Sequence, residues 1–73
     1  MYNFYMFDAA DNMLTWGQCA MHVIVSGELT QLAAELAADG KNVDYMLLAE
    51  SADRGEPPSV TQYRWRKTHW QRI

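Results

Sequence analysis

The sequence predicts a small α+β domain, an antiparallel sheet in β-β-α-β-β order with one helix packed on one face. Four segments rich in aromatic and β-branched residues are typical of strands. One segment carries apolar residues at helical spacing. The chain has 73 residues, 49% of them hydrophobic, which is enough for a single domain over residues 1–73 and one core.

Two extended segments and a turn open the chain. Residues 2–7 are rich in aromatics and predict a strand. Residues 8–12 predict a turn, because Asp and Asn side chains bond the local backbone there. Residues 13–25 predict a second extended stretch, bulged near Gly17, where a missing side chain weakens regular pairing. Its end, residues 21–25, is β-branched and is the best strand signal within it.

A helix is predicted over about residues 27–39. Its apolar positions recur with the period of one helix face; they are Leu29, Leu32, Ala33, Leu36 and Ala37. Ser26 is a candidate N-cap, and Glu28 complements the positive end of the helix dipole. Gly40 suits the left-handed position that ends a helix.

Two further strands complete the prediction. Residues 43–50 and 59–70 have strand composition, and residues 53–58 between them form a loop, because two prolines cannot join a central ladder.

Strand alternation places large apolar side chains on both faces of this sheet. Tyr2, Phe4 and Met6 share one face of the first strand, whereas Tyr5 and Phe7 lie on the other. The third strand divides similarly, with Tyr45 and Leu47 opposite Met46 and Leu48. One helix of about three turns covers one face only. Either the register is shifted or the C-terminal segment folds across the sheet, or the second face binds a partner or a second copy.

Charge is divided unevenly along the chain. The net charge is −3. Residues 1–53 contain eight acidic residues and one lysine, a net −7, whereas residues 54–73 contain five basic residues and Glu56, a net +4. An acidic body therefore precedes a basic, aromatic C-terminal segment.

That C-terminal segment is the sharpest candidate site in the sequence. As one strand it would place Tyr63, Trp65, Lys67 and His69 on one face and Arg64, Arg66 and Trp70 on the other. Aromatic rings beside cations are typical of single-stranded nucleic-acid binding, and Arg and Trp are typical of protein interfaces. The third interpretation is structural: the aromatics join the core and the cations are solvated or pair with the acidic half. We assign partner binding to these residues, namely Tyr63, Arg64, Trp65, Arg66, Lys67 and Trp70.

The acidic half also has two interpretations. Such charges keep a small domain soluble, or they imitate nucleic-acid phosphates and occupy a basic groove of another protein. On the second interpretation, Glu35 and Asp39 of the helix join the partner-binding residues.

Catalytic and metal-binding motifs are missing from the sequence. Cys19 and His22 lie three positions apart, so in a strand they point to opposite faces, and Cys19 is interpreted as a buried structural residue. One cysteine also excludes an internal disulfide. Paired metal-ligand spacings and glycine-rich phosphate loops are absent. We expect no catalytic residue, no metal and no cofactor.

These observations favour a non-enzymatic protein-binding protein that acts through an aromatic-rich surface, as a homodimer or on a larger partner. One specific version is a phage-type or mobile-element inhibitor of a host nucleic-acid machine. The alternative is a small single-stranded nucleic-acid-binding module that uses the basic aromatic C-terminal segment. The sequence shows no signal peptide or membrane-spanning segment, so a cytoplasmic protein without membrane contact is expected.

Overall fold

The computed structural model describes residues 2–19, 27–50 and 59–73. The element order is β-β-α-β-β-β, with the bounds β1 Tyr2–Phe7, β2 Met13–Cys19, α1 Glu28–Ala38, β3 Tyr45–Glu50, β4 Ser59–Trp65 and β5 Trp70–Arg72.

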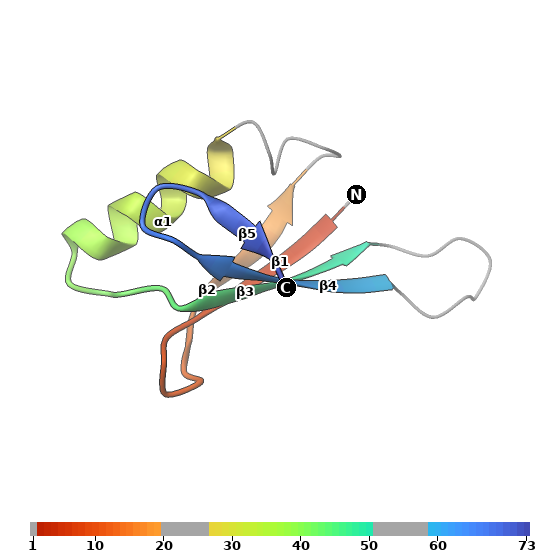
Figure 1. The fold of residues 1–73 in the computed structure, drawn as a ribbon, viewed down its shortest axis with the longest axis horizontal. Coiled ribbons are helices and arrows are strands. Elements are labelled where there is room, and N and C mark those ends of the chain that lie inside the picture. Colours follow the sequence, from red (N-terminus) through yellow and green to blue (C-terminus); the bar gives the residue numbers. More distant parts are fainter. Residues whose placement is uncertain (1, 20–26, 51–58) are drawn as a thin grey trace.

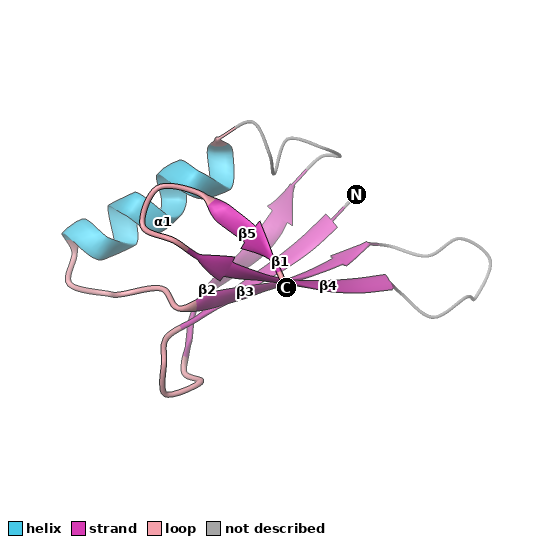
Figure 2. Ribbon diagram, in the orientation of Figure 1, coloured by secondary structure: helices cyan, strands magenta, loops and turns pink. Residues whose placement is uncertain are grey.

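The five strands form one antiparallel sheet in the order β2-β1-β3-β4-β5. Helix α1 lies along one face of this sheet (Figure 1). Among the described residues, no second helix lies on the other face (Figure 2). The predicted fold class, an α+β domain with a small antiparallel sheet and one helix, is confirmed.

The core lies between α1 and the central strands. Its largest fully buried side chains are Met6 of β1, Met46 of β3, and Leu29 of α1, and the cluster extends through Phe4 and Leu48. These strand residues alternate with side chains of the opposite face, as predicted for the first and third strands.

The irregularity in the first hairpin lies at Leu14 and not near Gly17. The register runs from Met6 opposite Thr15 to Phe7 opposite Met13, which leaves Leu14 as the extra residue. Gly17 is regularly paired opposite Phe4. The bulge turns Leu14 toward the core, because two successive side chains at a bulge share one side of the sheet.

The predicted fourth strand over residues 59–70 is two strands. β4 ends at Trp65, and the chain reverses so that Trp70 of β5 pairs with Trp65. Lys67 has a left-handed backbone, with φ 71°, and Arg66 N–H donates to the His69 carbonyl. Because the chain turns here, Trp70 lies on the face of Trp65, and the predicted grouping of Trp70 with Arg64 is wrong.

Helix α1 ends as predicted at Gly40, which has φ 81°. Gly40 N–H donates to the Ala37 carbonyl and Lys41 N–H to that of Leu36, the Schellman pattern that satisfies carbonyls at a helix end. At the other end Gly27 occupies the N-cap position. The predicted cap Ser26, the strand over 21–25 and the loop over 53–58 lie outside the described residues.

Candidate functional site: the open face of the sheet

The face of the sheet opposite α1 is called the open face below. Its members alternate with the core residues along each strand and lie opposite one another in the register. They are Asn3, Tyr5, Phe7, Met13, Trp16, Gln18, Tyr45, Leu47, Ala49, Val60, Gln62, Arg64, Gln71 and Ile73.

The large hydrophobic side chains that are exposed among the described residues all lie on this open face. Met13 is 54% exposed, Trp16 67%, Val60 58% and Ile73 64%. Between them the face carries half-buried Tyr5 and other apolar side chains of β1 and β3. Isolated exposed apolar residues are ordinary, but a contiguous apolar patch marks an interaction site.

Two aromatic rings give one end of the open face a fixed shape. The rings of Phe7 and Tyr45 are stacked, with centroids 4.9 Å apart and an angle of 12° between their planes. The Tyr45 hydroxyl donates a 2.8 Å hydrogen bond to Oδ1 of Asp11 in the turn after β1. This bond to a carboxylate raises the pKa of Tyr45 above its ordinary value of 10.0.

The turn that carries Asp11 is itself held by Asp8. Oδ1 of Asp8 accepts hydrogen bonds of 2.9 Å from the backbone N–H groups of Ala10 and Asn12, an arrangement that Asp favours in turns. These bonds lower the pKa of Asp8 below 3.8, and the bond from the Asn12 backbone contributes most to the lowering. Asp11 thus sits on an ordered turn at the rim of the open face.

The open face is almost uncharged. Arg64 lies opposite Tyr45 in the register, and Arg66 reaches the edge of the face, where its Nε donates to Oε1 of Gln71. These two are the charged side chains among the described residues of the face. The other polar members are amides, such as Gln62 and Gln71. Depletion of charge together with aromatic enrichment is what distinguishes the centre of a protein interface from ordinary surface.

The structure separates the predicted C-terminal site instead of assembling it. Tyr63, Trp65 and Trp70 lie on the side of α1 and pack against the core, and the two indole rings contact each other with centroids 4.8 Å apart. Nε1 of Trp70 is buried and meets no acceptor among the described residues. These rings are therefore partly covered by the protein itself and do not form an open row for stacking.

The predicted cations and carboxylates are spread over three places. Arg64 lies on the open face, whereas Arg66 and Lys67 lie at the β4–β5 turn, where Arg66 Nε donates to Gln71 Oε1 at 2.6 Å. Glu35 is exposed on α1, and Asp39 occupies the C-cap position of that helix.

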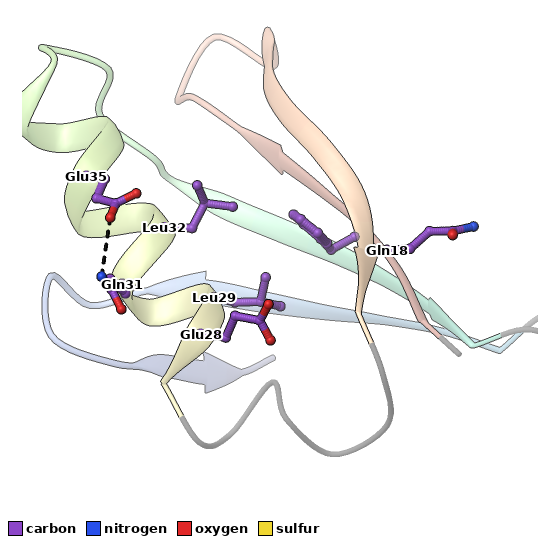
Figure 3. Close-up of a pocket in the computed structure, with 7 residues that line it drawn as sticks. Gln18, Glu28, Leu29, Gln31, Leu32 and Glu35 are labelled. Carbon is purple, nitrogen blue, oxygen red and sulfur yellow. Dashed lines mark hydrogen bonds between the residues drawn. The ribbon is translucent and has the colours of Figure 1, made fainter.

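Glu35 borders a cleft of about 270 Å³ between α1 and β2. In Figure 3 the side chains of Leu29 and Leu32 point from the helix toward the sheet, and Gln31 donates to Glu35 across one helical turn, at 3.3 Å. Gln18 of β2 points away from the helix in the same view. The cleft is thus apolar at its base and acidic at its rim, and it holds only one of the predicted site residues.

Cys19 is 6% exposed, as its interpretation as a buried residue predicts. Burial, and then the nearby Glu28 carboxylate, raise the pKa of its thiol above 9.0, which keeps the thiol protonated at neutral pH. No group of three or more His, Cys, Asp or Glu residues in the described part of the chain could hold a metal ion. None of its helices is long and apolar enough to cross a membrane.

Sequence reasoning recognised the second apolar face but placed the site elsewhere. The residues that it missed are two exposed ones, Trp16 on the edge strand β2 and Val60 on β4. What places them on the open face is the residue that each one pairs with: Trp16 lies opposite Tyr5, and Val60 lies opposite Ala49. Identifying these pairs requires the strand register, which the sequence does not specify.

Comparisons of this chain with known protein families, with curated proteins and with solved structures find no match.

Proposed function

We propose that this chain is a non-enzymatic protein-binding module whose binding surface is the open face. The observation that carries the proposal is the gathering of Met13, Trp16, Val60 and Ile73, each more than half exposed, on one side of one sheet. Contact with another protein would remove this apolar area from water, at about 25 cal/mol per Å².

Three features of the face support a protein as the partner class. Aromatic residues supply large contact area with few rotatable bonds, and Tyr5, Trp16 and Tyr45 lie close together in the register. The stacked Phe7 and Tyr45 rings are ordered before binding, which lowers the entropy cost of association. Arg64, a predicted partner-binding residue on this face, adds a planar cation opposite Tyr45 in the register.

Single-stranded nucleic acid is the weaker candidate. Binding it needs stacking rings flanked by several cations that meet phosphates. The rings of Trp65 and Trp70 pack against the core, and the described cations of the open face are only Arg64 and, at its edge, Arg66. The narrower hypothesis of an inhibitor that imitates nucleic acid needs an acidic surface, and would use Glu35 and Asp39 on α1 instead of the open face.

Comparative affinity capture tests the proposal. Tagged wild-type protein, Val60→Lys on the open face and Gln31→Lys on α1 would each be incubated with an extract of the source cells. Both substitutions add one positive charge at an exposed position. We expect wild type and Gln31→Lys to retain the same proteins and Val60→Lys to lose them. Retention of one set by all three contradicts the proposal.

A fluorescence titration decides between the two partner classes. Trp16 is 67% exposed on the open face, so a single strand stacked there would quench its emission. We expect no quenching by a short oligonucleotide at low salt. Quenching that weakens steeply as salt rises would favour nucleic acid instead.

A further inference from the structure

We infer that the open face is covered by a second copy of this chain, packed face to face about a two-fold axis that runs along β3. This inference rests on the proposed function, since it names the partner of the same face. It concerns the identity and orientation of that partner, and three properties of the face carry it.

The first property is charge. In a two-fold contact each patch meets itself, so a charged patch would repel its own copy. The open face limits this repulsion because its described charges are Arg64 and, at one edge, Arg66, which bonds Gln71. Its large exposed side chains, Trp16 and Val60 among them, are uncharged. A strongly charged partner would find little on this face to attract it. Homodimer interfaces are more apolar than other interfaces.

The second property is area. Four strands of six or seven residues and the three-residue β5, about 4.8 Å apart, give the face an area of roughly 460 Å². Two such faces remove about 900 Å² from water in projection, and more because side chains corrugate the surface. This reaches the lower range of specific interfaces, which begins near 1,000 Å². We therefore expect a dimer that dissociates on dilution.

The third property is the order of the strands. β3 is central in β2-β1-β3-β4-β5, so an axis along β3 lays β1 over β4 and β2 over β5 of the second copy. Leu47 then meets Leu47 on the axis, and Trp16 meets Ile73 of the second copy, since both lie at the level of Leu47 in the register. The two most exposed apolar side chains on the face would cover each other.

The same axis also places Arg64 favourably. Arg64 and Phe7 lie at the level of Tyr45 on opposite sides of β3. Arg64 therefore lies over the Phe7 ring of the second copy, at the end of the sheet where Tyr45 bonds Asp11. A guanidinium over an aromatic ring and near a carboxylate is attracted to both.

Sedimentation velocity over a wide concentration range tests whether the second copy binds. Wild type should move from the 8.4 kDa chain mass to twice that mass as concentration rises. Val60→Lys should weaken dimerisation at least tenfold, and Gln31→Lys should leave it unchanged. Wild type that stays monomeric at every concentration, or Val60→Lys that dimerises like Gln31→Lys, overturns the inference.

Disulfide trapping tests the axis. Trp16→Cys and Ile73→Cys would be made separately in a Cys19→Ala background, with folding checked by circular dichroism, and oxidised as an equal mixture. The proposed packing predicts that the mixed disulfide forms well above the half share that random pairing gives. Predominant Trp16→Cys homodimers would overturn this packing, because they indicate an axis across the strands or pairing of β2 edges.

The two tests separate this inference from the proposed function. If wild type is monomeric and Val60→Lys still fails to capture the proteins that wild type captures, the second copy is not the partner, but the open face still binds protein. A dimer whose only captured protein is the chain itself would support both.

Discussion

At Gly17 of β2, the Phe4 ring of β1 occupies the space that a side chain would fill. Gly17 lies opposite Phe4, and a Cβ atom built on it would lie 2.8 Å from Cε2 and Cζ of the Phe4 ring. Phe4 is itself in the core cluster, so its ring has little room to move. The absence of a side chain at Gly17 therefore leaves room for the Phe4 ring, and it does not produce a bulge in the strand.

We therefore expect Gly17→Ala to lower the free energy of unfolding by about 1–3 kcal/mol, the usual cost of an overpacked core. Urea denaturation measures it. Gly40→Ala is the control, since a Cβ at Gly40 contacts nothing within 4 Å and costs only its left-handed backbone, about 1–2 kcal/mol. The double variant with Phe4→Leu should recover part of the loss from Gly17→Ala. Full additivity of the two changes would contradict this explanation.

Asp8 gives the first hairpin a defined pH dependence. Hydrogen bonds from the backbone of Asn12 and Ala10 hold its pKa below 3.8 in the folded state. A group with a depressed folded pKa stabilises the fold above its unfolded pKa and loses that contribution as pH falls through the folded value. The difference in urea midpoint between wild type and Asp8→Ala should thus be constant above about pH 5 and shrink below about pH 4.

Asp8→Asn is the matched control for this titration. It retains an oxygen acceptor for the Ala10 and Asn12 N–H groups but carries no proton that titrates in this range. Its midpoint relative to Asp8→Ala should not change with pH. A wild-type difference that is equally independent of pH would show that the ionised Asp8 carboxylate does not stabilise the turn.

At the scale of elements, the β4–β5 hairpin contains a local conflict. Lys67 adopts φ 71°, a left-handed conformation that costs a residue with a Cβ about 1–2 kcal/mol. The hairpin forms nevertheless, because Trp65 and Trp70 pair across it and pack against the core. Tertiary packing therefore outweighs the local preference of Lys67.

Lys67→Asn should relieve this conflict, since Asn tolerates the left-handed region. We expect an increase of about 0.5–1 kcal/mol in the free energy of unfolding, measured by thermal or urea denaturation. Lys67→Ala removes the same charge but keeps the backbone cost, so it should show no such increase. Equal stability of the Asn and Ala variants would mean that the turn is not strained at Lys67.

The elements also show where sequence reasoning ends. The helix was predictable within a residue at each end, because its apolar period and Gly40 are local signals. The hairpin at Lys67 was not, since lysine is not a turn residue and the reversal depends on Trp70 reaching Trp65. The open face was half predictable: alternation within one strand identified Tyr5 and Phe7. Trp16 and Val60 joined them only through the registers of β2 with β1 and of β4 with β3.

At the scale of the whole molecule, the small size of the chain and its open face both limit how much apolar surface folding can bury. A chain of 73 residues buries only about 60% of the surface that its unfolded form exposes. α1 covers one side of the sheet, and the other side keeps Trp16 and Val60 largely in water. The apolar area that would add stability is present, but the described part of the chain leaves it unburied.

If a second copy covers the open face, stability must depend on protein concentration, because association favours the folded state by mass action. Each tenfold rise in concentration adds about 1.4 kcal/mol per dimer, which corresponds to about 3–6 °C in Tm for a folded unit of this size. Scanning calorimetry from micromolar to millimolar protein measures the slope. Gln31→Lys should keep it, and Val60→Lys should have a Tm that does not vary below the concentration at which it associates. A wild-type Tm equally independent of concentration would mean that the open face contributes nothing to the stability of this protein, and that whatever it binds is not another copy of the chain.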